Sequence, residues 1–382
     1  MLPSGRCGTG KTMADLSAFR HVAFDARPLL EPRGGLRRYL GELLPALAAE
    51  APHVAWTGIT IATPPDAPPD RVSWSVVPGP RASILRPFWE ALPLRRALES
   101  LGPDVFFSPW GAVPGGSPVP VVATLHDVSF LALPRTLPLR HRLYWSRLAR
   151  RLPLAAAVIA VSEATRTAAL ARLPLDPSRV HVVPEAAGSA FRPAGKDRVE
   201  EARKRHSLPE RFVLAVGAFE PRKNLGTAVA ATGLVARRLG APLPLVVVGR
   251  EAPGPIEGAP HARRLGPLGD DELAALMTSA TAVVVPSLDE GFGLPLLEAM
   301  SCGAPVVASN AGALPEVAGG AALLVDPLDD AGWVDALARI VEDDALAARL
   351  RSGGLARAEA FSWRATARAT LALLATVAEA RR

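Results

Sequence analysis

Short apolar runs recur along almost the whole chain and alternate with longer amphipathic stretches. The runs are continuous in Val, Ile, Leu and Ala, which is typical of parallel strands buried on both faces. Helical patterns such as LRRYLGELLPALAAE (36–50) and DDELAALMTSA (270–280) lie between them. This order predicts an α/β fold with doubly wound parallel sheets. The predicted strands lie at residues 21–26, 54–63, 72–77, 104–108, 121–127, 157–162, 180–184, 212–217, 244–249, 282–286, 304–309 and 321–325.

The alternation is interrupted once, at residues 184–211, which contain prolines, glycines and a charge run but no apolar run. A new strand pattern begins at Phe212. We therefore expect a domain boundary near 190–200 and two Rossmann-like domains that face each other across a cleft. The expected units are a leader at 1–12, a first domain at 13–195, a second domain at 196–360 and a C-terminal helix at 361–382.

The leader contains Gly-x-x-x-x-Gly-Lys-Thr at residues 5–12, the pattern of a nucleotide phosphate-binding loop. Such a loop needs a buried strand directly before it, so that backbone N–H groups converge on the phosphates. Only the residues MLPS precede Gly5. We interpret the pattern as a chance match and expect residues 1–12 to lie outside the fold, with Met13 as a natural start of the domain.

Composition narrows the class of protein. Hydrophobic residues make up 49% of the 382 residues and charged residues 21%, as in globular proteins with full cores. Cys7 and Cys302 form neither a disulfide framework nor a metal-ligand spacing, which favours a cytoplasmic location. No apolar run approaches eighteen residues, so no membrane-spanning helix is predicted. The net charge of +6 suits an anionic partner, although the low aromatic content argues against nucleic acid.

Polar or glycine-rich segments follow four of the predicted strands. In open α/β sheets, ligands bind beyond the carboxyl ends of the strands. Because these four segments come from both predicted domains, we expect them to meet at the cleft. They are Gly34-Gly35 after the first strand, His126-Asp127, AFEPRKN (218–224) and SLDEGFGLPLLEAM (287–300).

The last of these segments is typical of a phosphate site at a helix N-terminus. Gly291 and Gly293 permit a tight turn close to a ligand, and Pro295 fits the first turn of a helix. The free backbone N–H groups of Phe292, Gly293 and Leu294, together with the positive end of the helix dipole, would favour a phosphate.

Two carboxylates, Glu290 and Glu298, bracket this predicted phosphate site. They would repel a ligand that was phosphate alone. Carboxylates accept hydrogen bonds from hydroxyl pairs, so they suit a diphosphate with a ribose on one side and a sugar on the other. The alternative interpretation is a helix-capping carboxylate plus a surface glutamate.

Arg222 and Lys223 could supply the positive charge that a leaving diphosphate requires. The alternative is a solvated turn after a strand. For His126, a structural and a catalytic role remain equally open from the residues alone. The other histidines show no zinc spacing and no Asp-x-Asp follows a strand, so we expect no metal.

Together these segments resemble the retaining glycosyltransferases of family 4, which have the two-domain GT-B fold. The similarity extends over residues 21–375, and its most specific segment is 283–327 with Glu290 and Glu298. Supporting segments are GGLRRYL (34–40), TLHDVSFLALP (124–134), VSEATR (161–166), VVPEAAGSAF (182–191) and VGAFEPRKNL (216–225).

The resemblance implies that the first domain binds an acceptor and the second a sugar donor, with the last helix crossing back to the first domain. Ala218 departs from the family, where many relatives carry arginine, and Arg222 is its expected substitute. The roles implied are donor diphosphate for Arg222 and Lys223, nucleotide ribose for Glu298, donor sugar for Glu290, proximity to the transferred sugar for His126, and close approach to the phosphates for Gly35, Phe292, Gly293 and Leu294.

The reaction implied is transfer of a hexose from a nucleotide-diphosphate sugar to a glycan or glycolipid acceptor, with retention of configuration and without a metal cofactor. EPRKN together with TLHD resembles mannosyl-transferring members, which favours GDP-mannose over UDP-glucose and UDP-N-acetylglucosamine. Two other functions remain open: a GT-B sugar-nucleotide epimerase, and a nucleotide-sugar-binding protein without catalysis.

Residues 135–154 form a basic stretch with interleaved apolar side chains. On a helix, Arg140, Arg147 and Arg151 would share one side, and Leu137, Tyr144 and Leu148 an apolar row beside it. One interpretation is peripheral contact with an anionic membrane at its cytoplasmic face. The other is that the apolar row packs on the sheet and the arginines are solvated.

Overall fold

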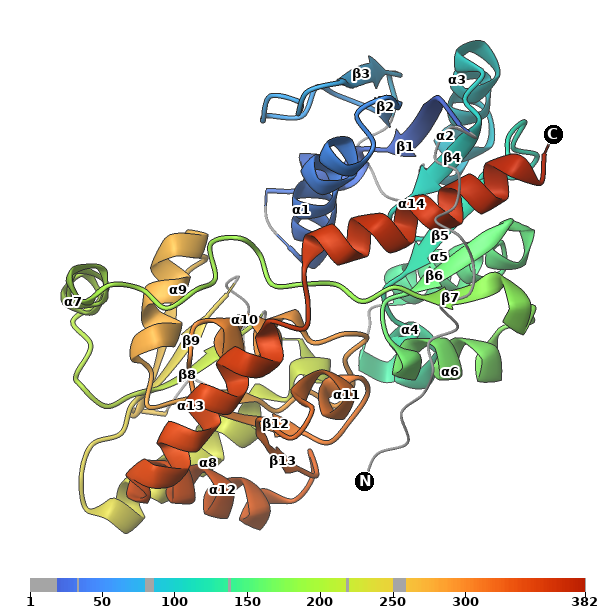
Figure 1. Ribbon diagram of the computed structural model, residues 1–382. Helices are drawn as coiled ribbons and strands as arrows, with labels where there is room; N and C mark the ends of the chain where they lie inside the picture. Colours follow the sequence, from blue (N-terminus) through green and yellow to red (C-terminus); the bar gives the residue numbers. More distant parts are fainter. Residues whose placement is uncertain are drawn as a thin grey trace.

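The computed structural model describes residues 19–32, 34–79, 86–136, 139–217, 220–249 and 259–381. They form two α/β lobes, each built around one parallel sheet (Figure 1). This arrangement confirms the predicted class of doubly wound sheets. The leader at 1–12 with its phosphate-loop pattern, Ala218 and Leu137 lie outside the described residues.

The first lobe contains a parallel sheet with the strand order β3-β2-β1-β4-β5-β6-β7. Two 3-10 segments, Pro134–Thr136 and Leu152–Leu154, flank the helix at Leu139–Ala149. The strands are β1 (His21–Asp25), β2 (Ala55–Thr60), β3 (Val72–Val76), β4 (Val105–Ser108), β5 (Val121–Leu125), β6 (Ala157–Ala160) and β7 (Val180–Val182). The helices are α1 (Gly35–Glu50), α2 (Arg86–Ala91), α3 (Pro93–Leu101), α4 (Ser129–Ala132), α5 (Leu139–Ala149) and α6 (Glu163–Arg172).

The second lobe contains a parallel sheet with the order β10-β9-β8-β11-β12-β13. The strands are β8 (Val213–Val216), β9 (Leu245–Val248), β10 (Ala262–Leu265), β11 (Ala282–Val285), β12 (Val306–Ser309) and β13 (Leu323–Val325). The helices are α7 (Lys196–Arg205), α8 (Leu225–Leu239), α9 (Asp270–Ser279), α10 (Leu294–Ser301), α11 (Leu314–Ala318), α12 (Asp330–Glu342) and α13 (Asp344–Ala358).

Every predicted strand is present, and β10 is an addition to them. Its sequence, ARRL, contains two arginines and therefore gives no apolar run. Among the described strands it pairs with β9 alone, at the edge of the sheet, where charged side chains can reach water. Hydrophobic patterning detects strands buried on both faces, and β10 is not one of these.

Each sheet is covered on both faces by helices. In the first lobe, α1 and α14 (Trp363–Glu379) pack on one face, where Leu40, Leu43 and Leu374 are fully buried. In the second lobe, α8 and α12 cover one face, and α9 and α10 the other. Burial of both faces explains why strands such as β6, β8, β9 and β11 are apolar throughout.

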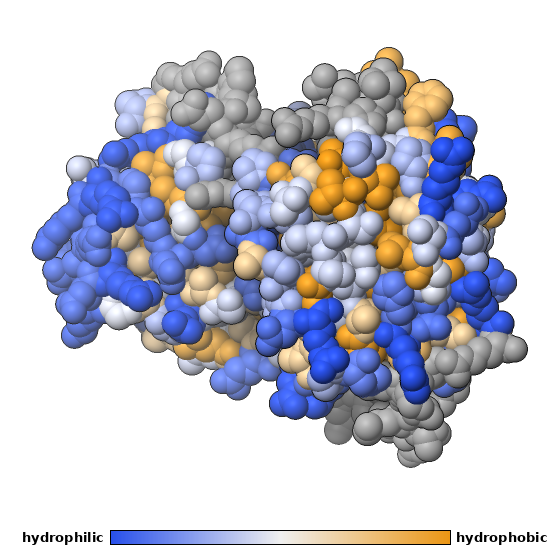
Figure 2. Space-filling view, turned by 90° about the horizontal axis from the view of Figure 1, so that it is seen from above, coloured by the Kyte–Doolittle hydropathy of each residue, from blue (hydrophilic) through white to orange (hydrophobic). Residues whose placement is uncertain are grey.

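The chain crosses from the second lobe back to the first at α14, drawn in red beside α1 (Figure 1). The indole N–H of Trp363 donates to the carbonyl of Ala187 at 2.9 Å. Arg364 and Arg368 both pair with Glu50 at the end of α1, at 2.6 and 2.7 Å. Seen from above, hydrophilic side chains cover much of the second lobe, and larger apolar patches interrupt the surface of the first (Figure 2).

Candidate active site

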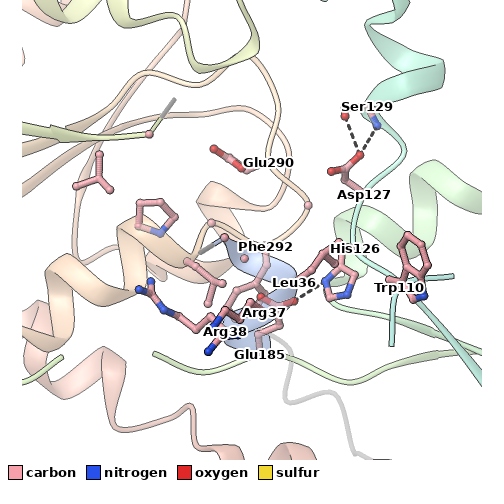
Figure 3. Close-up of a pocket in the computed structure, with 18 of the residues that line it drawn as sticks. Leu36, Arg37, Arg38, Trp110, His126, Asp127, Ser129, Glu185, Glu290 and Phe292 are labelled. Carbon is pink, nitrogen blue, oxygen red and sulfur yellow. Dashed lines mark hydrogen bonds and ion pairs between the residues drawn. The ribbon is translucent and has the colours of Figure 1, made fainter. Parts of the chain in front are cut away.

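A pocket of about 850 Å³ lies between the lobes and is lined by residues of both. The carboxyl end of β5 and the start of α1 contribute from the first lobe, and the loop between β11 and α10 contributes from the second (Figure 3). All nine residues predicted for the site line this pocket: Gly35, His126, Arg222, Lys223, Glu290, Phe292, Gly293, Leu294 and Glu298.

The loop before α10 has the geometry expected of a helix N-terminus open to a ligand. Gly293 lies directly before Leu294, the first helical residue. The φ of Gly293 is 100°, a conformation that L side chains rarely adopt. A Cβ at Gly293 would lie 2.6 Å from a methyl carbon of Leu314. No side chain of the described residues caps α10 at Gly293. Pro295 has no N–H and the N–H of Leu296 donates to the Gly293 carbonyl at 3.0 Å, so the N–H of Leu294 is the donor that the start of this helix offers to an anion.

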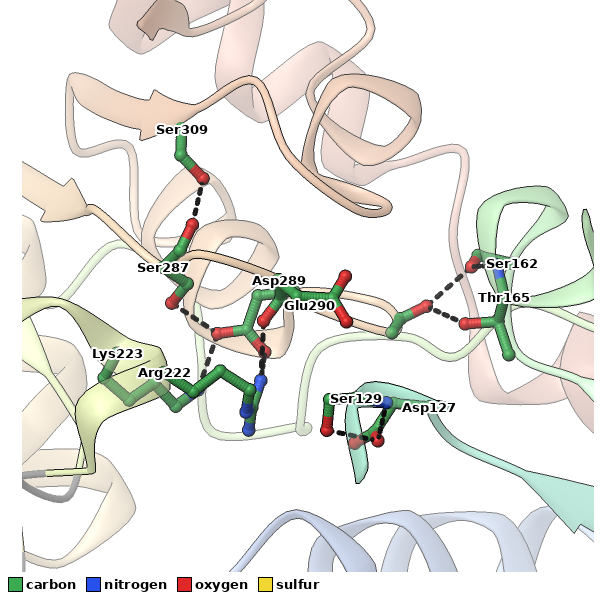
Figure 4. A network of polar contacts seen from close by, with 11 residues as sticks. Asp127, Ser129, Ser162, Thr165, Arg222, Lys223, Ser287, Asp289, Glu290 and Ser309 are labelled. Atoms are coloured by element: carbon green, nitrogen blue, oxygen red, sulfur yellow. Dashed lines mark hydrogen bonds and ion pairs between the residues drawn. The ribbon is translucent and has the colours of Figure 1, made fainter. Parts of the chain in front are cut away.

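Glu290 is buried and binds the side chains of both Arg222 and Lys223, a pairing that the sequence did not predict (Figure 4). Lys223 Nζ donates to Glu290 Oε1 at 2.6 Å, and Arg222 donates to Oε2 at 2.9 Å. The Ser287 hydroxyl donates to Oε1 at 2.7 Å. Burial opposes ionisation of this carboxyl, but Lys223 and Arg222 outweigh it and lower the pKa of Glu290 to about 2. Arg222 and Lys223 are therefore held in place by a permanent negative charge.

Glu298 is 1% exposed and pairs with Arg38, which comes from α1 in the other lobe. Arg38 also donates to Asp270 at the start of α9, at 2.6 Å. Burial raises the pKa of the Glu298 carboxyl to about 7, although the Arg38 guanidinium acts in the opposite direction. One arginine thus joins the first lobe to two carboxylates of the second.

His126 is fixed through both ring nitrogens. Nδ1 lies 2.8 Å from a carboxylate oxygen of Glu185, and Nε2 lies 2.7 Å from the carbonyl oxygen of Pro109. Both partners accept, so both nitrogens carry a hydrogen when both bonds form. Burial favours the neutral ring, but Glu185 outweighs it and raises the pKa of His126. The Tyr39 ring meets the imidazole edge to face at 4.7 Å between centroids.

Glu185, Arg38 and Asp270 line the pocket and were not predicted. Glu185 follows β7 by a short segment, and the strand-end rule that singled out His126 could have found it. Arg38 and Asp270 carry no such signal. Each lies in an ordinary helical pattern, and their pairing joins positions far apart in the sequence.

The two glycines at the start of α1 differ in whether the backbone itself requires glycine. Gly34 has a φ of 138° and precedes the helix, whereas Gly35 is its first residue. A Cβ at Gly35 would lie 4.0 Å from Leu294, an ordinary contact. The fold itself therefore requires glycine at 34, and a requirement at 35 would have to come from a bound ligand.

The part of the pocket that lies in the first lobe, which we call the aromatic arm, is lined by aromatic side chains. Trp110, Phe130 and Trp145 line it together with Leu148. The Trp110 indole N–H donates to Asp25 at 2.7 Å, and the rings of Phe130 and Trp145 stack at 6.4 Å. The arm therefore presents rigid apolar faces beside His126.

The basic stretch forms α5, and its predicted apolar row packs inward. Leu148 is buried and Tyr144 packs against Trp110, which confirms the packing interpretation for these two residues. Leu139 and Leu143, outside that row, are 59% and 62% exposed. The side chain of Arg140 lies outside the described residues.

Among the described residues, no group of three or more His, Cys, Asp or Glu side chains is arranged to hold a metal ion. Metal independence itself stays a prediction. No helix in the described ranges is both long enough and apolar enough to cross a membrane.

The two parallel-sheet lobes with a shared pocket define the GT-B class of fold. WaaG, a glycosyltransferase involved in lipopolysaccharide biosynthesis, superposes with a TM-score of 0.75 over 92% of this chain and 98% of that chain, at 17% identity. Residues 33–186 match the model of Glycosyltransferase Family 4, and residues 198–357 match that of Glycosyl transferases group 1. The chain belongs to glycosyltransferase family 4.

Two curated relatives are similar over part of their length. O-antigen chain mannosyltransferase B of Escherichia coli is 32% identical over 259 residues, which cover 63% of this chain and 66% of that protein. D-inositol 3-phosphate glycosyltransferase of a Nocardioides species is 40% identical over 223 residues, which cover 51% of this chain and 48% of that protein. The chain thus spans less than two thirds of either relative.

Proposed function

We propose that the chain is a retaining glycosyltransferase that transfers mannose from GDP-mannose to a glycan or glycolipid acceptor. The observation that carries this proposal is the arrangement of Arg222 and Lys223, which Glu290 holds beside the open N-terminus of α10. The choice of mannose is supported by the similarity to the O-antigen chain mannosyltransferase.

The cations would stabilise the departing diphosphate. Their positions are set before the donor arrives, because each is already bonded to Glu290, so little reorganisation is needed as charge develops. Lys223 has three N–H donors and Arg222 has five, so each can bind a phosphate oxygen without leaving Glu290. The N–H of Leu294, at the start of α10, would add a donor to the same phosphates.

Glu290 and Glu298 would hold the two ends of the donor. Oε1 of Glu290 accepts from Lys223 and Ser287, whereas Oε2 accepts from the Arg222 side chain and retains capacity for a sugar hydroxyl. At Glu298 the ribose hydroxyls would take the place of Arg38, which can keep its bond to Asp270.

His126 would contribute charge and position rather than act as a base. A ring that donates through both nitrogens, to Glu185 and to Pro109, has no lone pair with which to remove a proton. This supports a front-face reaction in which the leaving diphosphate itself takes the proton of the acceptor hydroxyl. The contribution of the protein is then electrostatic stabilisation and alignment of the two substrates.

The aromatic arm would bind the acceptor. The C–H face of a sugar ring packs well on indole and phenyl faces, and Trp110, Phe130 and Trp145 offer such faces next to His126. A glycan acceptor, or the sugar part of a glycolipid, fits this arm.

A thermal-shift screen with GDP-mannose, UDP-glucose and UDP-N-acetylglucosamine tests the donor, because a ligand that binds only the folded state raises the melting temperature. We expect the largest shift with GDP-mannose. A shift with UDP-sugars and none with GDP-mannose would overturn the choice of donor. Conversion of the donor to an isomer without acceptor would indicate an epimerase, and binding without turnover in any acceptor extract would indicate a sensor.

The proposal includes peripheral contact with an anionic membrane at the cytoplasmic face, through the outer side of α5. Leu139 and Leu143 are exposed there, one helical turn apart, and Arg147 and Arg150 are exposed further along. Replacing both leucines by serine should reduce co-sedimentation with anionic vesicles at low salt. The matched control is Leu328→Ser, at an exposed leucine of the second lobe. Equal sedimentation of both variants would exclude α5 as the contact.

A further inference from the structure

Two buried hydroxyl groups of the first lobe bind the loop between β11 and α10 of the second lobe, which we call the donor loop. Ser162 Oγ donates to the carbonyl oxygen of Gly291 at 2.6 Å, and Thr165 Oγ1 donates to the same oxygen at 2.8 Å (Figure 4). Ser162 precedes α6 and Thr165 lies in its first turn. A single carbonyl of the loop between Glu290 and Phe292 therefore receives two hydrogen bonds from the opposite lobe.

A carboxylate of the second lobe reinforces the same contact. Glu316, in α11, accepts from the backbone N–H groups of Glu163 and Ala164 at 3.0 and 3.1 Å. These are N–H groups that an α-helix leaves without an internal partner, and a negative charge is favoured at that end of the helix. The start of α6 thus donates to the second lobe through two side chains and two backbone groups.

Gly291 is confined on its other side by the end of β5. A Cβ at this position would lie 1.7 Å from the carbonyl oxygen of His126 and 2.8 Å from the Cβ of Asp127. The peptide group that follows Gly291 is therefore held between two elements of the first lobe, the residues after β5 and the start of α6.

The orientation of this peptide group decides where one donor points. The carbonyl of Gly291 and the N–H of Phe292 belong to the same planar peptide, which is trans, as are the peptide bonds throughout the described residues. In a trans peptide the two groups point in opposite directions. Two hydroxyls on the carbonyl therefore direct the N–H of Phe292 away from α6, and the Phe292 ring is fixed against Phe361 at 5.7 Å between centroids.

We propose that Ser162 and Thr165 are positioning residues, which orient the Phe292 N–H toward the donor diphosphate when the two lobes are closed. This inference rests on the proposed function, because it takes the pocket lined by Gly291, Phe292 and Gly293 as the diphosphate site. The proposal predicts that closure and chemistry are coupled, because opening the lobes removes the hydroxyls that set the peptide plane. The donor loop is then complete only in the closed form.

Thr165→Val is the most informative variant. Valine keeps the shape and removes the hydroxyl, whereas Ser162 also accepts from the Thr165 N–H at 2.9 Å and thereby caps α6. Thr167→Val, at an exposed position of the same helix, is the matched control. Thr165→Ser restores the hydroxyl. It tests whether the hydrogen bond to the Gly291 carbonyl, rather than side-chain packing, causes any loss of activity.

We expect Thr165→Val to lower kcat about five- to tenfold, the effect of one net hydrogen bond, with the donor KM within about twofold of the unaltered protein. Thr165→Ser should recover most of the loss and Thr167→Val should have no effect. A kcat equal to that of Thr167→Val, or a loss that serine does not restore, would overturn the proposal.

Hydrogen exchange separates this inference from the proposed function, because it needs no substrate. In the ligand-free protein, a peptide covering residues 288–296 should exchange faster in Thr165→Val than in Thr167→Val. Unchanged exchange would show that the hydroxyl does not hold the loop, even in an active enzyme. If the unaltered protein transferred no sugar from any donor, the proposed function would fail, and with it the role toward the diphosphate.

Discussion

At the scale of single residues, the site is a set of buried charges arranged before any ligand binds. Glu290 forms ion pairs with Arg222 and Lys223. Glu185 binds the His126 ring, and Arg38 forms an ion pair with Glu298. Glu290 is kept ionised by its cations, whereas Glu298 is pushed toward neutrality by burial. The two glutamates are therefore not equivalent, although their spacing in the sequence makes them look like a pair.

Replacing Lys223 by alanine should lower transferase activity by roughly two to three orders of magnitude, because one preorganised donor to the leaving diphosphate is lost. Arg222 and Ser287 would still satisfy Glu290, so the melting temperature should change little. Lys204→Ala is the control, since that side chain is largely exposed. Turnover close to normal in Lys223→Ala would remove Lys223 from the site.

The donor KM should depend on pH through Glu298. Its pKa of about 7 means that raising the pH from 6 to 8 converts it to the carboxylate, the better acceptor for ribose hydroxyls. We expect the KM to fall over this range and the fall to disappear in Glu298→Gln. The raised pKa also means that Glu298 stabilises the fold below pH 4.5 and that this contribution is lost as the pH rises through 7.

Kinetics of Glu290→Ala and Glu298→Ala at a fixed pH check the same assignment. Removing the Glu298 carboxylate should raise the donor KM, and removing the Glu290 carboxylate should lower kcat. Exchanged effects, or a pH dependence that persists in Glu298→Gln, would contradict the roles assigned to the two carboxylates.

At the scale of elements, the donor loop between β11 and α10 shows what a sequence can and cannot reveal. Its glycines and the proline after them were enough to predict a tight turn into a helix, because Gly293 has a backbone that only glycine adopts easily. The neighbours of Gly291 were not predictable. They lie directly after β5 and at the start of α6 in the other lobe, and only the folded chain brings them together.

Gly291→Ala should abolish most activity without unfolding the protein. The added Cβ would meet the His126 carbonyl, a backbone atom that cannot rotate away, so the lobes must separate to relieve the contact. Small-angle scattering should show a larger radius of gyration than for Gly266→Ala, where a Cβ meets nothing within 4 Å. An active Gly291→Ala enzyme with unchanged dimensions would show that closure does not use this contact.

The same limit explains the other differences between sequence and structure at this scale. Continuous apolar runs located every strand that is buried on both faces, but β10 carries Arg263 and Arg264 and was missed. In α5 the helical pattern and its apolar row were correct, but the pattern left open whether the row would pack inside the protein or face a membrane. Tyr144 and Leu148 meet Trp110, and Leu139 and Leu143 meet solvent.

At the scale of the whole molecule, contacts between the lobes coincide with the pocket they enclose. Arg38 bridges to Glu298 and Asp270, and the start of α6 bridges to Gly291 and Glu316. Helix α14 returns to the first lobe and packs along α1. Because lobe closure and site assembly use the same residues, binding of the donor and movement of the lobes are expected to be linked.

Transfer of mannose from GDP-mannose to a panel of mannosides tests whether the protein is a retaining mannosyltransferase. The one-bond C1–H1 coupling of the new linkage reports its configuration. Since GDP-mannose carries the α anomer, retention of configuration should give an α-linked product that is formed by the unaltered protein and nearly lost in Lys223→Ala. A β-linked product, or equal product from both proteins, would contradict it.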